Sequence, residues 1–399
     1  MTTPTPPAGA RIAPIAYPPT TDPPVDLSTV AALEDFEPLA AKRMHPMGYS
    51  YVAGGACSGE TVVENVAAWR RFRLVPRVLV DVGSVDLRTT LLGREVAMPL
   101  GIAPAALHGL AHVEAEQATA RAATGAGVLQ TVSTAASARL EEVAEAAPGG
   151  PRWFQLYVAR DHGFTRSLVE RAEAAGYDAI ALTVDLPVLG RRLDLVRHGF
   201  DPGVGCYGNF PLAGEGGDLG GDPRELVDTR SIGFLWPDLE AIRSWSSLPL
   251  VLKGILAPDD ARLAVEHGAA GIWVSNHGGR QLDRVLSGAE ALAPIVETVD
   301  GRAEVYVDGG VRWGTDVLTA LALGARAVFT ARPLLYALAC AGEAGVAHGL
   351  AIMRDELERG LALLGVRSPA EVTRAHVQIP RGADNTTPRR WTDGAASGE

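Results

Sequence analysis

Eight short apolar segments recur along the middle of this chain, each separated from the next by a stretch with helical periodicity. They lie at residues 98–104, 127–133, 152–158, 178–185, 248–254, 270–276, 304–310 and 326–333. Strands that are apolar throughout, rather than alternately apolar and polar, are typical of a parallel sheet covered by helices. Eight such units therefore predict an α/β fold, a (β/α)8 TIM barrel.

A doubly wound open sheet is the structural alternative to this barrel. That fold usually carries a GxGxxG motif directly after its first strand, where the backbone binds a dinucleotide. No such motif follows residues 98–104, and eight units are many for an open sheet. The pattern favours the barrel.

The segments that flank the eight units differ from them in composition. Residues 27–97 precede the barrel and predict an N-terminal helical cap, whereas residues 200–231 form a long Gly- and Asp-rich loop after strand 4. We expect that loop to be a mobile lid at the barrel mouth. Residues 1–26 contain eight prolines and predict a disordered arm, and residues 380–399 predict a flexible tail. One catalytic domain would then span residues 27–379.

The composition excludes several classes of partner. The net charge is −11, which argues against nucleic acid and against an anionic membrane surface. Cys57, Cys206 and Cys340 lie far apart, with no spacing typical of a metal site or a redox motif. A reduced cytoplasmic setting fits them, since the N-terminus shows no secretory signal and the apolar runs are too short to span a membrane. We expect no bound metal.

Polar side chains gather where the expected strands end. TIM-barrel active sites are built at the carboxyl ends of the strands. One polar residue there is unremarkable, because every loop begins with one, but the pattern here recurs on six strands. It includes these residues: Gln155, Tyr157, Thr183, Asp185, Lys253, His277, Arg280, Asp308, Arg312 and Arg332.

The most specific of these stretches is SNHGGRQLD at residues 275–283. Together with WFQLYV, ALTVDLP, VLKGI, VDGGVRWGTDV and ALALGARAV, it resembles the FMN-dependent 2-hydroxy acid oxidase and dehydrogenase family. The resemblance extends over residues 49–360, and the 4-hydroxymandelate oxidases look especially similar. It implies a TIM barrel that binds FMN and oxidises a 2-hydroxy acid to a 2-oxo acid.

The resemblance assigns the catalytic residues. His277 would be the general base, because an imidazole can take up and release a proton near neutral pH. Asp185 would stabilise the imidazolium that forms. Tyr157 would hydrogen-bond the substrate. A lone histidine is more often structural, and a tyrosine is more often a core residue, but the SNHGGR context favours the catalytic interpretation.

The same resemblance supplies residues for the substrate carboxylate. The guanidinium of Arg280 could hold a carboxylate through two parallel hydrogen bonds. Arg192 is the expected second cation, although its neighbour Arg191 is an alternative. Tyr51 and Tyr157 match the family tyrosines that bind the carboxylate and hydroxyl groups.

The expected FMN site draws on residues at or just after the ends of all eight expected strands. Lys253 would lie against the flavin ring, where a cation favours the reduced form. Neutral hydrogen bonds would come from side chains near the ring, and glycine backbone would approach the phosphate. The expected FMN contacts are Ala105, Ala106, Ser133, Gln155, Thr183, Lys253, Ser275, Asp308, Gly309, Gly310, Arg312, Ala331 and Arg332.

Two positions depart from the family pattern. Ala331 stands where the phosphate segment commonly has glycine, which adds a methyl group there. Ala135 stands where glycolate oxidase has an active-site tryptophan, so we expect an enlarged pocket that favours a bulky or aromatic substrate. Ala106 matches a small residue near the reactive flavin nitrogen and leaves room for oxygen.

These residues predict the oxidation of a bulky or aromatic, mandelate-like L-2-hydroxy acid to the 2-oxo acid, with O2 as acceptor and H2O2 as product. Three alternatives remain open: a dehydrogenase of the same family that uses a quinone or protein acceptor, a non-redox FMN isomerase, and a non-enzymatic flavoprotein. The resemblance also suggests a homotetramer or homo-octamer.

Overall fold

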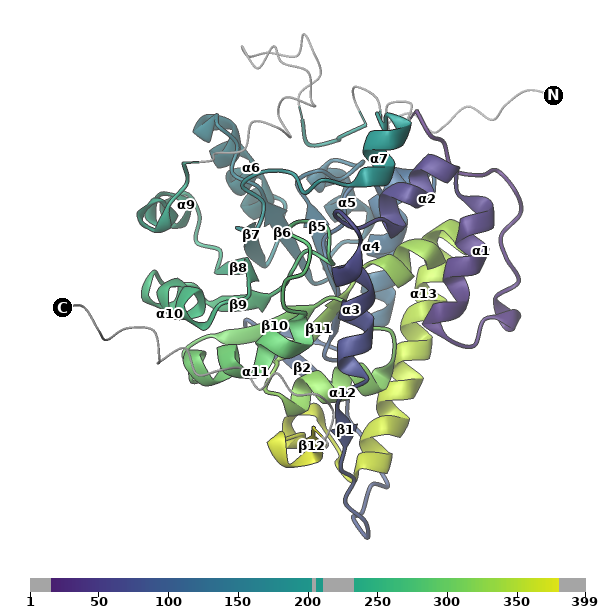
Figure 1. The fold of residues 1–399 in the computed structure, drawn as a ribbon, viewed down its shortest axis with the longest axis vertical. Coiled ribbons are helices and arrows are strands. Elements are labelled where there is room, and N and C mark those ends of the chain that lie inside the picture. The colour runs from purple at the N-terminus through teal and green to yellow at the C-terminus, as the bar shows by residue number, and fades with distance from the viewer. Residues whose placement is uncertain (1–15, 203–205, 211–232, 380–399) are drawn as a thin grey trace.

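The computed structural model describes residues 16–202, 206–210 and 233–379, and its centre is a closed barrel of eight parallel strands (Figure 1). The order around the barrel is β10-β11-β4-β5-β6-β7-β8-β9. The closed ring confirms the TIM barrel and excludes the open sheet. The strands are β4 (Leu100–Ile102), β5 (Leu129–Ser133), β6 (Arg152–Leu156), β7 (Ala179–Thr183), β8 (Leu250–Ile255), β9 (Gly271–Val274), β10 (Glu304–Asp308) and β11 (Ala327–Thr330).

Helices surround the barrel and cover its outer face (Figure 1). Their ends follow local sequence signals: Ser287 caps the first turn of α11 in a capping box with Glu290, and Gly127 ends α4 with φ +67°. The helices after the strands are α4 (Ala115–Ala126), α5 (Leu140–Ala146), α6 (His162–Ala174), α7 (Leu193–His198), α9 (Leu239–Ser244), α10 (Pro258–Glu266), α11 (Gly288–Val299), α12 (Gly314–Ala322) and α13 (Arg332–Leu364).

Large aromatic side chains fill the inside of the barrel. Trp153, Trp273, Tyr306 and Phe329 are fully buried there, and the rings of Trp273 and Phe329 lie 4.0 Å apart. Small residues make room for them, since a Cβ at Gly101 would come within 2.4 Å of the Phe329 ring. The interior is therefore a packed core, and the free space lies at the ends of the strands.

The segment before the barrel is helical only in its first half. It contains α1 (Phe36–Arg43), α2 (Pro46–Ala53) and α3 (Glu60–Trp69). The expected helical cap over residues 27–97 is therefore wrong beyond α3, where the chain is largely extended. Its strands are β1 (Arg73–Leu74), which pairs with β12 (Val377–Gln378), and the hairpin of β2 (Thr89–Leu91) and β3 (Arg94–Val96).

The hairpin arises from its turn. Leu92 and Gly93 both have positive φ, of 47° and 83°, which matches the twist of a tight two-residue hairpin. Leu91 and Val96 then point into the barrel interior cluster, and the Leu92 N–H donates to the Glu304 carboxylate at the start of β10. The hairpin thus closes the amino end of the barrel, away from the carboxyl ends of the strands.

Residues 16–26 differ from the disordered arm that their prolines predicted. The Tyr17 ring stacks on Phe200 at 5.3 Å, and its hydroxyl accepts a hydrogen bond from the Asp201 N–H. The Val25 N–H donates to the Cys340 carbonyl, so this part of the arm lies against the barrel. Residues 1–15 and the expected tail at 380–399 lie outside the described residues.

The longest helix is also apolar. By length and composition α13 could cross a membrane, but most of its apolar stretch is buried inside the protein, as in the core helix of a globular fold. It is also interrupted at Ala341 and Gly342, whose backbone is not helical.

The loop after β7 is described only in part. Most of the expected lid at residues 200–231 lies outside the described residues. The described piece 206–210 is packed rather than open, since Cys206 is fully buried and Asn209 is 2% exposed. This piece returns to the mouth of the barrel.

Candidate active site

A pocket with about 1100 Å³ of empty space, part of it open to solvent, lies at the carboxyl ends of the barrel strands. Its lining includes these predicted residues: Tyr51, Ala105, Ala106, Ser133, Tyr157, Arg192, Lys253, His277, Arg280, Asp308, Gly309, Gly310, Arg312, Ala331 and Arg332.

The other four predicted residues lie behind the lining and contact it. Asp185 bonds to His277, Ser275 bonds to Lys253, and Gln155 bonds to both Ser133 and Thr183. The structure thus brings the whole predicted set together from strands that are far apart in the sequence. The roles of the individual residues remain predictions.

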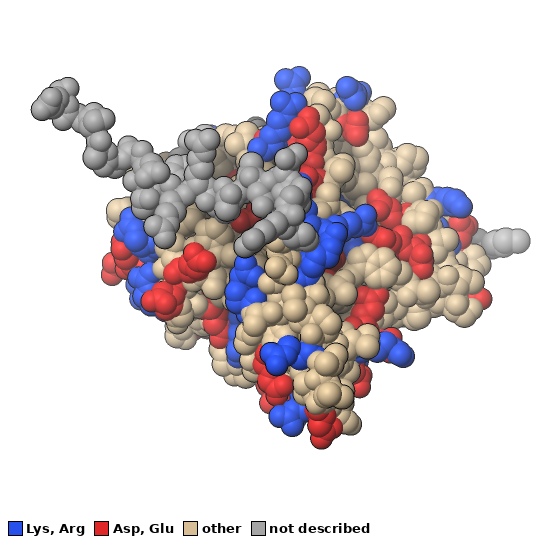
Figure 2. Space-filling view, turned by 60° about the horizontal axis from the view of Figure 1, so that its bottom comes forward, with Lys and Arg blue, Asp and Glu red and all other residues tan. Residues whose placement is uncertain are grey.

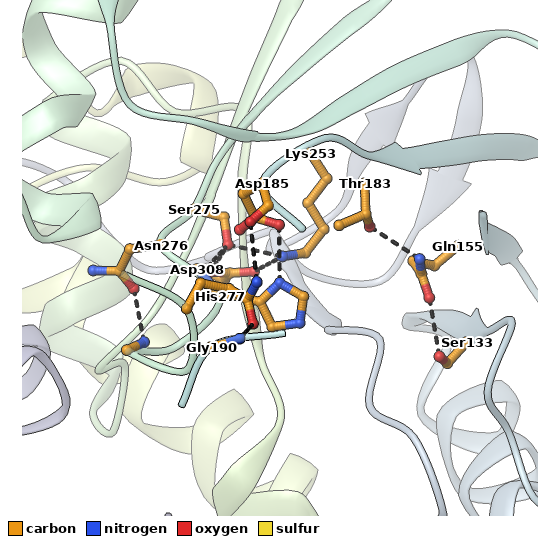
Figure 3. Close-up of polar contacts among 12 residues, drawn as sticks. Ser133, Gln155, Thr183, Asp185, Gly190, Lys253, Ser275, Asn276, His277 and Asp308 are labelled. Carbon is orange, nitrogen blue, oxygen red and sulfur yellow. Dashed lines mark hydrogen bonds and ion pairs between the residues drawn. The ribbon is translucent and has the colours of Figure 1, made fainter. Parts of the chain in front are cut away.

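His277 lies in a loop that only an unusual backbone can form. His277, Gly278 and Gly279 have successive φ values of 58°, 63° and 74°, and the His277 N–H donates to the Ser275 hydroxyl. A histidine with positive φ is under backbone strain, and strain of this kind is found more often at functional sites than elsewhere. The turn aims the imidazole at Asp185 (Figure 3).

The His277 imidazole and the Asp185 carboxylate form a hydrogen-bonded pair that is suited to proton transfer. Nδ1 of His277 lies 3.0 Å from Oδ1 of Asp185. Burial lowers the pKa of His277 despite the carboxylate beside it. Burial would raise the pKa of Asp185, but His277 and Lys253 hold that pKa below its ordinary value. Asp185 is therefore an anion and His277 a neutral base, with Nε2 left to accept a proton.

Lys253 belongs to a buried network that joins three strands. Its Nζ lies 3.0 Å from Oδ2 of Asp308 and 2.7 Å from the Ser275 hydroxyl, which itself donates to Oδ1 of Asp308 (Figure 3). The ammonium group also lies 5.3 Å from the centre of the Trp273 ring. The sequence predicted the lysine but not its pairing with the Asp308 carboxylate, which we expected to act only through its backbone.

A row of neutral hydrogen bonds runs along the neighbouring strand ends. The Ser133 hydroxyl donates to Oε1 of Gln155 at 2.9 Å, and Nε2 of Gln155 donates to the Thr183 hydroxyl at 3.0 Å (Figure 3). The strand register places Ser133 beside Gln155 and Thr183 beside Lys253. Together these residues form one polar edge of donors and acceptors.

Two partly buried arginines bind the carbonyl groups at the end of α2. Arg280 donates to the Tyr51 and Gly54 carbonyls at 2.7 and 2.9 Å, and Arg332 donates to the Val52 and Gly54 carbonyls. Cations stabilise the carboxyl end of a helix, where carbonyl groups lack partners. These contacts bring the ring of Tyr51 to the pocket, 5.0 Å from the Arg280 guanidinium.

The positive charges of Arg280 and Arg332 are only partly balanced by the carbonyl groups that they contact. Burial and the nearby Arg192 lower the pKa of Arg280 to about 9, and burial lowers that of Arg332 to about 10. Both stay charged at neutral pH. Arg192 Nε is buried with no hydrogen-bond partner among the described residues, whereas Arg191 is exposed. Of these two neighbours, Arg192 is therefore the one that lines the pocket. Such a pocket favours anionic ligands even though the chain is acidic overall.

A glycine cradle follows β10 beneath α3. Gly309 and Gly310 have φ values of 98° and 79°, and a Cβ at Gly310 would overlap the backbone carbonyl of Asn65. The indole of Trp69 donates to the Gly309 carbonyl at 2.8 Å. Helix α3 thus fixes a stretch of bare backbone beside Arg312, where a phosphate group could approach closely.

Comparison with known proteins identifies the class to which this site belongs. A family model described as FMN-dependent dehydrogenase matches residues 40–379. The chain belongs to this family. The chain is 44% identical to 2-hydroxyacid oxidase 2 from Rattus norvegicus, over 88% of this chain and 99% of the relative. It is 45% identical to glycolate oxidase from Spinacia oleracea, over 87% and 95% respectively.

Solved structures in this family agree with the fold. A mandelate oxidase variant with (S)-mandelic acid superimposes with a TM-score of 0.80 at 41% identity, over 88% of this chain and 99% of that one. Mandelate oxidase with (S)-4-hydroxymandelic acid has the same TM-score, identity and coverage.

The pocket of this FMN-dependent dehydrogenase family member fits its cofactor. The polar edge of Ser133, Gln155 and Thr183, with Lys253 at its end, offers the donors and acceptors that a flavin ring requires. The glycine cradle with Arg312 and Arg332 offers bare backbone and cations for a phosphate group. Ala331 lines the pocket in place of the commoner glycine without closing it.

The sequence missed several residues of the pocket wall. Leu186, Leu189 and Tyr207 line it, although none of them lies at a strand end. Leu186 and Leu189 follow Asp185 closely, so their proximity was the available signal. Tyr207 lies in a Gly-rich stretch whose course no local pattern predicts.

Proposed function

We propose that this protein is an FMN-dependent oxidase that converts an L-2-hydroxy acid with a bulky or aromatic side chain into the 2-oxo acid, with O2 as electron acceptor. The observation that carries the proposal is the position of the His277–Asp185 pair in one pocket with Arg192 and Arg280. A base beside two cations suits a substrate that has a carboxylate next to an oxidisable carbon.

The wall of the pocket supports the choice of substrate. Ala135 lines it where glycolate oxidase has tryptophan, and Leu186 and Leu189 add apolar surface. An apolar wall of this kind favours a substrate side chain that buries hydrocarbon surface. The solved relatives with mandelic acids agree with that preference.

The residues divide the reaction between binding and proton transfer. Arg280, Arg192 and Tyr51 bind the carboxylate and fix the orientation of the 2-carbon. His277 Nε2 takes a proton from the substrate, and the Asp185 anion stabilises the imidazolium that results. Bound FMN supplies the two-electron acceptor for this oxidation. The substrate thus loses two electrons and two protons, and O2 takes up two of each to become H2O2.

The deciding experiment is anaerobic reduction of the purified holoenzyme with a panel of 2-hydroxy acids, followed by admission of air. We expect mandelate-type acids to bleach the flavin absorbance faster than glycolate does, and air to restore it with one equivalent of H2O2. Bleaching that air does not reverse would instead support a dehydrogenase with a quinone or protein acceptor. No bleaching by any 2-hydroxy acid would contradict the proposal and favour the isomerase or the non-enzymatic flavoprotein.

The partners of the protein belong to the same proposal. Acidic and basic side chains are interspersed over the described residues visible in Figure 2, and this mixed charge pattern does not favour a nucleic-acid partner. We propose a cytoplasmic homotetramer or homo-octamer without nucleic acid or membrane as partner. Light scattering of the holoenzyme tests the assembly, and cell fractionation tests the location.

A further inference from the structure

The described piece of the loop after β7 is docked onto the loop that follows β5, two strands away in the barrel. Cys206 is fully buried in an apolar cluster with Leu107 and Leu110. The Gly208 N–H donates to the Ala136 carbonyl at 2.9 Å, and a Cβ at Gly208 would come within 2.4 Å of the backbone of Ala138. Because Cys206 and Gly208 are both packed closely, Tyr207, which lies between them in the sequence, is held in a fixed place.

Asn209 ties the same piece to the end of β5, where Ser133 begins the polar edge. Its Oδ1 accepts from the Leu140 N–H at 2.8 Å, and its Nδ2 donates to the Ser133 and Thr134 carbonyls at 3.3 and 3.1 Å. A buried amide with three hydrogen bonds is expensive to break, because each group left unpaired loses its solvation. Asn209 therefore couples the loop after β7 to the end of β5.

Tyr207 faces the pocket from this docked piece. It lines the pocket together with Ala135 and Arg192, its ring packs on Phe210 at 5.7 Å, and it shares an apolar cluster with Tyr51. Its hydroxyl makes no hydrogen bond with any described residue. The tyrosines outside the pocket behave differently, since every one of their hydroxyls has a protein partner. Tyr17 accepts from the Asp201 N–H, and the other four donate to a protein acceptor: Tyr49, Tyr177, Tyr306 and Tyr336.

The chemistry of this hydroxyl suits an anionic oxygen. Burial raises the pKa of Tyr207, so the phenol stays protonated and can donate. The charge of Arg192 acts on the same phenol, and Arg192 Nε is itself buried without a partner among the described residues. Two such donors on one pocket wall are satisfied together by a carboxylate.

We infer that Tyr207 is a third tyrosine of the substrate site, whose hydroxyl donates to the substrate carboxylate beside Arg192, and that Asn209 is the positioning residue that holds it there. This inference rests on the proposed function. It adds to the site a donor from the loop after β7.

The test measures ligand binding rather than turnover alone. Benzoylformate, a 2-oxo acid that cannot be oxidised further at its 2-carbon, is titrated into the oxidised holoenzyme, and the flavin absorbance reports the dissociation constant. We expect Tyr207→Phe to raise that constant about tenfold, because one hydrogen bond to a charged group is lost. Asn209→Ala should raise it similarly, and the double variant should add little to either change.

Two further variants separate the hydroxyl from the ring. Tyr49→Phe removes a hydroxyl that bonds to Glu37 outside the pocket, and it should leave the dissociation constant unchanged. Tyr207→Ala removes both the ring and the hydroxyl. If Tyr207→Ala weakens binding while Tyr207→Phe does not, the ring is only a wall and the inference is wrong. FMN content and melting temperature report whether each variant is folded.

The outcome is separable from that of the proposed function. If 2-hydroxy acids bleach the flavin and Tyr207→Phe binds benzoylformate as the wild type does, only this inference fails. If no 2-hydroxy acid bleaches the flavin, the proposed function fails, and the inference is overturned with it.

Discussion

At the scale of single residues, the site depends on how buried charges are arranged around one imidazole. His277 bonds to an anion on one side, while burial and the cations of the pocket disfavour its charged form. The result is a neutral base at physiological pH, next to groups that stabilise the proton once it has been transferred. Burial lowers the pKa of Arg280 to about 9, which still leaves its guanidinium charged at neutral pH and able to bind an anion.

Removal of the His277 imidazole should slow flavin reduction strongly and leave the fold intact. We expect His277→Ala to slow the anaerobic bleaching by substrate at least about a hundredfold, which is the usual contribution of a general base. His267→Ala is the matched control, because that ring stacks on Trp236 outside the pocket, and it should bleach at the wild-type rate. Stopped-flow absorbance measures both, and a His277→Ala variant at full speed would contradict the mechanism.

The pKa directions predict how the rate depends on pH. Reaction requires neutral His277, so the rate falls as the pH drops through its pKa, and burial places that acid limb below the ordinary histidine value of about 6.5. Asp185 raises the pKa of His277, so Asp185→Asn should move the limb to still lower pH and also reduce the plateau. A pH profile of kcat/KM checks this, and a limb that moved to higher pH would contradict the sign.

At the scale of elements, the phosphate cradle depends on one helix that packs against one turn. Helix α3 reaches the turn after β10 through Trp69 and Asn65, and Asn65 also exchanges two amide hydrogen bonds with Asn276 after β9. One helix therefore positions two loops of the site. Helix α3 therefore contributes to the shape of the pocket although it lies outside the barrel.

Two glycines with similar backbone angles allow a matched test of this packing. Gly310→Ala should destabilise the fold by more than about 2 kcal/mol and weaken FMN binding at least tenfold, because both the positive φ and the contact with Asn65 oppose a side chain. Gly301→Ala has the same strain at φ 70° but open space around it, so it should cost about 1 kcal/mol and leave FMN binding unchanged. Denaturant unfolding measures the loss of stability, and FMN fluorescence quenching measures the loss of FMN affinity. If both variants lost the same amount of each, backbone strain would explain the effect without the contact with Asn65.

At the scale of the whole molecule, the N-terminal segment reaches the active site through a stack of rings. Tyr17 stacks on Phe200, and Phe200 stacks on Tyr51 at 5.0 Å. Residue 17 precedes the region matched by the family model, so this contact is a feature of the chain beyond that region. Residues 16–26, the loop after β7 and α2 are thus joined by one stack of rings, which ends at Tyr51 in the pocket lining.

Truncation of the stack should affect substrate binding more than catalysis. We expect Tyr17→Ala to raise KM several-fold with little change in kcat, since an aromatic pair contributes about 1 kcal/mol and Tyr51 would be less well held. Tyr17→Phe, which keeps the ring, serves as the control and should stay near the wild-type KM. Steady-state assays measure both, and an unchanged KM in Tyr17→Ala would show that the arm has no part in binding.

Local patterns along the sequence were sufficient to predict the barrel and to bring most of the site residues together. Apolar runs separated by helical stretches encode strands and helices through contacts that are local in the chain, and the carboxyl ends of parallel strands must meet, so Lys253, His277 and Asp308 could be placed together. The features that depend on long-range packing became visible only in the folded structure. It showed the hairpin at the amino end of the barrel, the Lys253–Asp308 pair and the position of Tyr207 on the pocket wall. Contacts of this kind join residues that are far apart in the sequence, and no local pattern records which distant partner fills the space beside them.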